Sequence, residues 1–446
     1  MSAQIPRLAT TLDEATEALD FVRPLMSGDP RWKNLNPARG GDVARIIGRY
    51  LTRAERGDFK HVVFASHRGA GKSTELFRLA HDLREQFTCL YLEANVEMDA
   101  NTIEMEDLLL VLARKVEEML RDKGFSLAPA VLDRVNRWFS ETIKTTSVGR
   151  DYVAKVETEI KSGLQIPYLA SLLAKVTALF RVESKHRTEV KEVLRQYPGT
   201  LMDVVNQLLD AANEALKPLG RELLVIIDNL DRYHPKVIDE LLVRGGDRFR
   251  ELKTNLILTP PISLVYRPET GALADYFHVE VMPSVRLRGP KDPYDALVGE
   301  GPKLLLDALG YRIDLDTLIP DQAARDRLVI ASGGSIRELL EVTSDATLLA
   351  DGESLTRDDV ERAIKRRGAR MRDVINANGW LDALVDIACT HQIRSDAAYL
   401  SLLHHRLAFK YNEENWYDAH PLAYEIAEFQ AAMAQREAEE AHVLRG

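Results

Sequence analysis

Four short apolar runs interrupt a chain in which helical periodicity otherwise predominates. They lie at residues 61–65, 89–93, 223–227 and 255–258, and the first of them reads HVVFA. Short continuous apolar runs are typical of strands that are buried on both faces of a parallel sheet. A Gly-rich loop and a stretch with helical spacing separate the first two runs. This order of strand, loop, helix and strand predicts an α/β sheet.

Helical periodicity fills two long regions, from about residue 102 to 220 and from about 293 to 375. In the first region one predicted helix face carries Leu201, Val204, Val205, Leu208, Leu209 and Ala212. Such a stripe is typical of a helix with one buried face. The first region lies between two predicted strands, so we expect a helical insertion there. The second region predicts a separate helical domain.

The segment 163–180 is apolar enough to be compared with a membrane span. It is interrupted by Pro167 and Lys175 and is shorter than the roughly 20 residues that cross a bilayer. Its strongest apolar residues have the spacing of an amphipathic helix: Leu169, Leu172, Leu173, Val176, Leu179 and Phe180. We therefore predict a core helix at this position and no contact with a membrane.

The C-terminal part of the sequence has a different pattern. Two helices are predicted at about 380–390 and 395–406, followed by the strand-like residues 408–411, a turn at 412–415 and then Trp416. Two helices and a short hairpin in this order predict a winged-helix unit. Its second helix carries little positive charge, which favours a packing or autoinhibitory role over DNA reading. The Ala- and Glu-rich tail beyond it predicts a surface helix that frays.

Composition and charge narrow the class of protein. Of the 446 residues, 45% are apolar and 29% are charged, which is a soluble globular balance, and the formal net charge is −10. A chain this acidic is not a dedicated polyanion binder. Two cysteines exclude a disulfide framework and a cysteine-based metal site. No apolar stretch follows a basic N-terminus, so we expect no signal peptide and a cytoplasmic location.

The Gly-rich loop carries the first candidate chemistry. It reads Ser66-His67-Arg68-Gly69-Ala70-Gly71-Lys72-Ser73-Thr74 and keeps the spacing of the phosphate-binding pattern G-x-x-x-x-G-K-[ST], with serine in place of the first glycine. Gly69 and Gly71 allow backbone N–H groups to face an anion at the start of the next helix. Lys72 is predicted to contact the β- and γ-phosphates, and the Ser73 hydroxyl to bind Mg²⁺. The loop therefore predicts a site for ATP or GTP.

The third apolar run supplies the matching acids, because it ends in Asp228-Asn229-Leu230-Asp231-Arg232. An acid at the tip of a buried strand beside the loop strand can bind the Mg²⁺ of the nucleotide. We assign that role to Asp228. Asp231 is the nearest candidate to polarise the attacking water, and the alternative is a turn or cap carboxylate.

Together the loop and the acid cluster resemble the AAA+/STAND branch of P-loop NTPases, over about residues 35 to 430. The acid string is similar to KAP-type and NACHT-type members, and the later segments resemble the helical lid and winged helix of origin-recognition ATPases. Two features depart from the pattern. Asn229 stands where most AAA+ proteins have glutamate, which implies slow hydrolysis of ATP. The long separation of Lys72 and Asp228 leaves room for an insertion, which in KAP proteins carries membrane helices and here does not.

The resemblance also implies roles for residues outside the two motifs. Thr259, after the fourth apolar run, occupies the place of the sensor-1 residue that contacts the γ-phosphate or the water; a strand-end cap is the alternative. Arg337, in the segment 332–340, resembles the sensor-2 arginine of the lid, with a surface salt bridge as the alternative. Arg248 and Arg250 lie where an arginine finger often occurs, and either could equally be a solvated charge.

These observations predict an α/β P-loop NTPase fold with a large helical insertion, a helical lid and a C-terminal winged helix. The predicted boundaries are 1–58 for an N-terminal helical linker, 59–290 for the NTPase domain, 291–376 for the lid, 377–430 for the winged helix and 431–446 for the surface tail.

The function implied by the resemblance is that of a switch ATPase, which binds ATP with Mg²⁺ and assembles with itself or with a separate effector protein, as in antiphage defence. The alternative is a DNA-binding ATPase that acts as a loader or transposition-type regulator. Nucleic acid is the less favoured partner, because the basic residues between 362 and 372 share their segment with acids.

Overall fold

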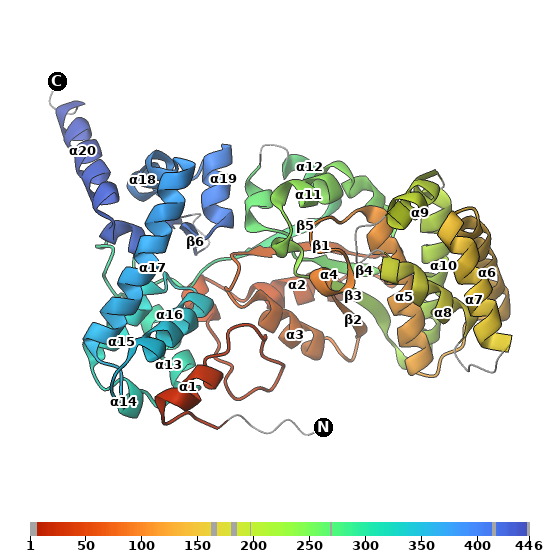
Figure 1. Ribbon diagram of the computed structural model, residues 1–446, viewed down its shortest axis with the longest axis horizontal. Coiled ribbons are helices and arrows are strands. Elements are labelled where there is room, and N and C mark those ends of the chain that lie inside the picture. Colours follow the sequence, from red (N-terminus) through yellow and green to blue (C-terminus); the bar gives the residue numbers. More distant parts are fainter. Residues whose placement is uncertain are drawn as a thin grey trace.

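A parallel five-stranded sheet forms the centre of the molecule (Figure 1). The computed structural model describes residues 7–161, 167–179, 185–196, 198–267, 270–412 and 416–443. The strand order is β2-β3-β4-β1-β5. The strand bounds are His61–Ser66 for β1, Phe87–Glu93 for β2, Glu222–Asp228 for β3, Asn255–Leu258 for β4 and His278–Met282 for β5. The four predicted strands and the predicted fold class are confirmed.

The sequence pattern did not predict β5, which pairs with β1 at one edge of the sheet. Its residues HVEVM alternate between apolar and polar types, and all except Met282 are partly exposed. Alternating residues do not form a continuous apolar run. β5 therefore lacks the signal that revealed the other four strands, including β2 at the opposite edge of the sheet.

Side chains that alternate along each strand bind two layers of helices to the sheet. Val62 and Phe64 of β1 pack with residues of α2 (Val43–Thr52) and α3 (Lys72–Asp82) on one face. Val63 points to the opposite face, where it shares a core with α5 (Met105–Asp122) and α10 (Pro198–Leu216). Three short helices complete this region: α4 (Ala94–Glu97), α11 (Pro235–Asp239) and α12 (Thr270–Tyr276).

The insertion between β2 and β3 forms a helical bundle at one end of the sheet (Figure 1). Between α5 and α10 lie α6 (Pro129–Lys144), α7 (Ser147–Lys161), α8 (Tyr168–Leu179) and α9 (Lys185–Gln196). Leu169, Leu172, Leu173 and Val176 of α8 are buried, as the amphipathic pattern predicted. Residues 163–166 and Phe180 of that predicted helix lie outside the described residues. Within the described ranges, no helix combines the length and the apolar character that crossing a membrane demands.

The N-terminal segment differs from the predicted helical linker. It contains α1 (Leu12–Ala18), a short 3₁₀ turn at Asn36–Arg39 and α2, while residues 19–35 form no helix. Pro24 and the Gly28-Asp29-Pro30 turn prevent regular helical hydrogen bonding in between. Ala15 and Leu19 are buried in the core of the lid rather than in that of the sheet domain. The segment therefore connects the lid with the sheet domain.

The opposite end of the molecule holds two smaller helical units (Figure 1). The lid consists of α13 (Gly301–Gly310), α14 (Leu315–Leu318), α15 (Gln322–Ala331), α16 (Ile336–Leu349) and α17 (Arg357–Asn378). Then follow α18 (Leu381–Thr390), α19 (Ala397–His404), the antiparallel strands β6 (Ala408–Tyr411) and β7 (Trp416–Ala419), and α20 (Ala427–Val443). Two helices before a hairpin is the order expected for a winged helix; residues 413–415 of the predicted turn lie outside the described part.

Candidate nucleotide-binding site

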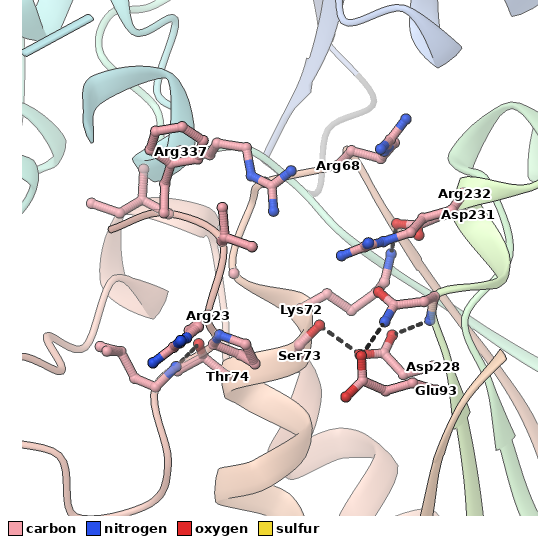
Figure 2. Close-up of a pocket in the computed structure, with 18 of the residues that line it drawn as sticks. Arg23, Arg68, Lys72, Ser73, Thr74, Glu93, Asp228, Asp231, Arg232 and Arg337 are labelled. Atoms are coloured by element: carbon pink, nitrogen blue, oxygen red, sulfur yellow. Dashed lines mark hydrogen bonds and ion pairs between the residues drawn. The ribbon is translucent and has the colours of Figure 1, made fainter. Parts of the chain in front are cut away.

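A pocket lies at the carboxyl edge of the sheet, where the Gly-rich loop follows β1 (Figure 2). Four parts of the chain line it: the N-terminal segment 20–25, the loop, the ends of β2 and β3, and the start of α16. Ligands of α/β proteins bind at this edge of the sheet, where helix N-termini and strand ends meet. The loop, Asp228 and Arg337 were expected at this pocket, whereas the N-terminal segment was not.

Two glycines give the loop its shape. Gly69 and Gly71 have positive φ angles of 88° and 97°, a conformation that side chains with a Cβ atom rarely adopt. A Cβ atom added to Gly69 would lie 2.5 Å from the Cβ atom of Arg337, so a glycine is also needed for the close approach of the lid. Ser66 is still part of β1 and has no positive φ angle. Serine can therefore replace the first glycine of the motif without strain.

The side chains of the predicted loop residues point in different directions. Those that line the pocket are Arg68, Gly69, Gly71, Lys72, Ser73 and Thr74. His67 points away from it, contrary to its assignment as a nucleotide-binding residue, and its Nε2 atom accepts a 2.9 Å hydrogen bond from the backbone N–H of Lys410 in β6. Burial lowers the pKa of His67 to about 3, so the ring is neutral and can accept this bond. The winged-helix unit thus holds the loop.

Lys72 forms an ion pair with Asp231 at the base of the pocket. Its Nζ atom lies 2.7 Å from an Asp231 carboxylate oxygen, and the two side chains are only 5% and 10% exposed. A nucleotide that binds Lys72 through its phosphates therefore competes with Asp231 for the ammonium group. Asp231 was predicted to polarise the attacking water, and the structure places its carboxylate on this lysine.

Asp228 is surrounded by hydroxyl donors. Ser73 Oγ donates a 2.5 Å hydrogen bond to its carboxylate, Thr259 Oγ1 donates one of 2.7 Å, and the Tyr91 hydroxyl donates another. Burial alone would raise the pKa of Asp228, but the nearby Lys72 charge and these three donors hold the pKa below its usual range. The carboxylate is therefore ionised at neutral pH.

The Ser73 hydroxyl and the Asp228 carboxylate fit the predicted Mg²⁺ site. The fold brings them into contact although 155 positions separate them in sequence. Oxygen atoms of this kind are the protein ligands that Mg²⁺ prefers, with water and phosphate oxygens completing its coordination. Elsewhere in the described residues, no group of three or more His, Cys, Asp or Glu side chains could hold a metal ion.

Thr259 and Arg337 were both predicted to sense the γ-phosphate, and the structure places them differently. Thr259 is fully buried, and its hydroxyl faces Asp228 rather than the pocket. Arg337 lines the pocket, and its backbone N–H donates a 3.3 Å hydrogen bond to the Gly69 carbonyl oxygen. Burial and the neighbouring charges of Arg406, Arg68 and Arg232 lower the pKa of Arg337. An anion in the pocket would relieve this repulsion between cations.

Neither of the two arginines considered as fingers lines the pocket of its own chain. Arg248 forms a 3.2 Å ion pair with Glu106 of the insertion. Arg250 donates to the Asp275 carbonyl oxygen and lies 4.9 Å from the centre of the Tyr276 ring. Both are engaged within the chain, and a role for either in a neighbouring subunit stays a prediction.

Arg39 supports the loop from behind and was missed in the sequence. It is 2% exposed, donates a hydrogen bond to the Ala70 carbonyl oxygen and lies 3.9 Å from Glu75 of α3. Burial lowers its pKa to about 10, which Glu75 partly offsets, so it is charged at neutral pH. The partners of Arg39 are far away along the chain, so no local sequence motif marks this residue.

We expect Arg39→Met to destabilise the protein by about 1–3 kcal/mol, because the buried Ala70 carbonyl oxygen loses its donor. Glu75 keeps its 2.7 Å ion pair with Arg78, so the loss stays within this range. Urea unfolding of the two proteins measures the difference, with the exposed Arg244→Met as the control. Equal unfolding midpoints for Arg39→Met and the parent would show that the contact adds no stability.

Residues 69–244 match the model of the KAP family P-loop domain. The Walker-type ATPase of Pyrococcus abyssi is 14% identical with a TM-score of 0.43, covering 91% of this chain and 98% of that one. Cdc6p from Pyrobaculum aerophilum is 11% identical with a TM-score of 0.35, covering 98% of this chain and 97% of that one. ORC1 of Aeropyrum pernix in complex with DNA is 13% identical with a TM-score of 0.38, covering 94% of this chain and 98% of that one. No curated protein matches the sequence.

The matched segment includes the loop from Gly69, the insertion and the acid cluster at the end of β3. The loop from Gly69 and the acid cluster line the pocket, whereas the segment 20–25, Arg68 and the start of α16, which also line it, lie outside the matched residues. Residues 69–244 are therefore similar to the P-loop domain of the KAP family, and the chain has a P-loop NTPase fold.

Proposed function

We propose that this protein is a switch ATPase that binds ATP with Mg²⁺ in the pocket and hydrolyses it slowly. The observation that carries the proposal is the convergence on one pocket of Lys72, the Ser73–Asp228 pair and, from the lid, Arg337. Lys72 and Arg337 would bind phosphate oxygens, and Ser73 and Asp228 would hold Mg²⁺. When bound, the metal ion would neutralise charge on the β- and γ-phosphates.

The charges around the pocket support a polyphosphate ligand. Arg23, Arg68 and Arg232 lie around it together with Lys72 and Arg337. Figure 2 shows Arg232 and Arg337 extending toward the pocket from opposite sides. Cations crowded together without an anion repel each other, so a triphosphate would stabilise the closed arrangement of loop and lid.

The contacts between loop, lid and winged helix support a switch. In the lid, the backbone N–H of Arg337 donates a hydrogen bond to the Gly69 carbonyl oxygen. In the winged helix, the backbone N–H of Lys410 donates one to the His67 ring. Phe409 also contacts the His67 ring, with 5.1 Å between ring centres. We propose that these contacts make the position of both units depend on the nucleotide, and that the winged helix restrains the loop in the empty state.

Assembly with further copies of this chain and with a separate effector protein is part of the proposal, and so is a role in antiphage defence. Both rest on the resemblance to STAND proteins, and the helical insertion is our candidate surface for partner or trigger recognition. The alternative of a DNA-binding loader has less support. Among its predicted basic contacts, Arg362 pairs with Asp359, and Arg367 pairs with Glu338, Glu341 and Asp345 of α16.

We expect Arg337→Ala to leave ADP binding nearly unchanged and to remove the ATP-specific change in shape or assembly. A residue that contacts ATP but not ADP gives the two nucleotides different affinities for the closed state. Light scattering of both proteins with ADP and with a slowly hydrolysed ATP analogue measures this effect. A variant that reproduces the full ATP-specific transition of the parent would show that the lid is coupled to the nucleotide in another way.

A further inference from the structure

Glu93 lines the pocket, and the sequence predictions gave it no role. It is the last residue of β2 and lies in register with Asp228, the last residue of β3. Both side chains therefore leave neighbouring strands at the same edge of the sheet, and both line the pocket (Figure 2). Glu93 is exposed, whereas Asp228 is 1% exposed, so Glu93 is accessible to water.

Asn229 holds the Glu93 carboxylate in place. Its Nδ2 atom donates a 3.0 Å hydrogen bond to Glu93 Oε2. Asn229 itself is fixed by a left-handed backbone conformation with a φ angle of 66°, and its N–H donates to Asp228 at 2.8 Å. Asn229 stands where the AAA+ pattern has a glutamate. A carboxylate is nevertheless present within hydrogen-bond distance of this position, supplied by the neighbouring strand.

The other carboxylates of the pocket are engaged by other partners. Asp228 faces three hydroxyl donors and the predicted metal site, and Asp231 is paired with Lys72. Asp20 accepts from the Val22 backbone N–H at 2.8 Å and lies on the N-terminal segment. Glu93 is exposed and its hydrogen bond comes from the neutral amide of Asn229, so water has access to its carboxylate.

We propose that Glu93 is the general base of ATP hydrolysis and that Asn229 is its positioning residue. The assignment rests on the proposed ATPase function and replaces Asp231 in the role of base. A water molecule transfers a proton to Glu93 while its oxygen forms a bond to the γ-phosphorus. The bond from that phosphorus to the β–γ bridging oxygen breaks, and ADP leaves with the electron pair. Glu93 then returns the proton to solvent, so that ATP and water yield ADP, phosphate and a proton.

Single-turnover hydrolysis of Mg²⁺-ATP by the full chain tests the assignment. Glu93→Gln keeps the size and the hydrogen-bonding capacity of the side chain but removes the base. We expect the rate constant to fall by about 10²–10⁴-fold while the affinity for Mg²⁺-ATP changes less than about twofold. Glu85→Gln, at the other end of β2 with an exposed side chain, is the matched control and should keep the parent rate. We expect Asp231→Asn to lose less activity than Glu93→Gln.

A double variant can exchange the residues at positions 93 and 229. Glu93→Asn combined with Asn229→Glu returns the carboxylate to the neighbouring strand end, and we expect hydrolysis at least about tenfold faster than in Glu93→Asn alone. The acid limb of the pH–rate profile should disappear in Glu93→Gln and persist in Asn229→Ala, which a merely structural role of Glu93 would not produce.

Three results overturn the proposal or a part of it, and they are distinguishable. If Glu93→Gln binds and hydrolyses ATP at the parent rate, the assignment of the base is wrong and the proposed function stands. If the parent itself binds ATP but does not turn it over, the proposed ATPase function fails together with its base. An exchanged double variant no faster than Glu93→Asn would show that Asn229 does not position the base.

Discussion

Replacing Lys72 by alanine is expected to weaken the binding of ATP at least about tenfold, because the variant loses the ammonium group that faces the β- and γ-phosphates. The side chain is 5% exposed in the structure, so solvent screens its charge very little. Competition between ATP and a fluorescent nucleotide analogue measures the affinity. Lys253→Ala, at an ion pair with Asp210 on the surface, should leave the affinity unchanged.

The ion pair with Asp231 complicates this variant, because removal of Lys72 leaves a nearly buried carboxylate without its cation. An unpaired buried carboxylate destabilises the protein, and its negative charge would also repel phosphates. Lys72→Ala combined with Asp231→Asn removes both charges and separates the two effects. The double variant should regain thermal stability and still bind ATP weakly. Recovery of the parent affinity would mean that Lys72 acts only by neutralising Asp231.

Replacing Asp228 by alanine is expected to abolish metal-dependent binding of ATP and its hydrolysis together. The variant loses the predicted Mg²⁺ ligand, and it also leaves the hydroxyl groups of Ser73, Tyr91 and Thr259 without their common acceptor. Substitution of a residue that only orients a metal ligand typically costs about 10–100-fold in metal affinity, and loss of the ligand itself should exceed this. Titration of ATP hydrolysis with Mg²⁺ measures the change.

Thr259→Val provides the comparison for Asp228→Ala. The Thr259 hydroxyl faces Asp228 and not the pocket. The valine variant should therefore weaken the activation of ATP hydrolysis by Mg²⁺ by about tenfold without abolishing it. Asp231→Asn should spare metal-dependent binding, because it keeps the Mg²⁺ ligands, and it should slow hydrolysis less than Glu93→Gln does. If Asp228→Ala shows the same dependence on Mg²⁺ as the parent, Asp228 is a structural residue.

The central sheet could be predicted because its buried strands are continuous apolar runs. β1 and β3 are almost entirely buried, and their last residues, Ser66 and Asp228, mark the edge of the sheet at which the pocket lies. The edge strand β5 escaped prediction because only one of its residues is buried. Continuous apolar runs thus reveal the three inner strands and the edge strand β2, and miss β5, in which apolar and polar residues alternate.

The candidate site was predicted only where its residues belong to a local motif. Lys72, Ser73 and Asp228 have recognisable neighbours in the sequence, and the structure brings them together. Glu93 and Arg39 have none, since the role of each follows from strand register or from a contact across the fold. Glu93 offered one signal that was not used, namely its place at the end of a predicted strand beside that of Asp228.

The N-terminal segment shows a further limit of periodicity. Residues 20–25 form a wall of the pocket, and the Leu25 backbone N–H donates to Thr74 Oγ1 at 3.1 Å. An irregular segment has no hydrophobic periodicity in its sequence. Its position in the fold is set by the elements against which it packs. Here the packing partners are the lid and the loop, neither of which is near in sequence. Only the punctuation by Pro24 and Gly28 indicated that a continuous helix was the wrong interpretation.

Calorimetric titration of the unaltered chain with ATP in the presence of Mg²⁺ measures nucleotide binding at this pocket. We expect saturable binding of one nucleotide per chain that weakens when Mg²⁺ is chelated, because Ser73 and Asp228 are proposed to hold the triphosphate through the metal ion. Absence of binding at millimolar ATP, or binding that is indifferent to both Mg²⁺ and the Lys72→Ala substitution, would contradict this expectation.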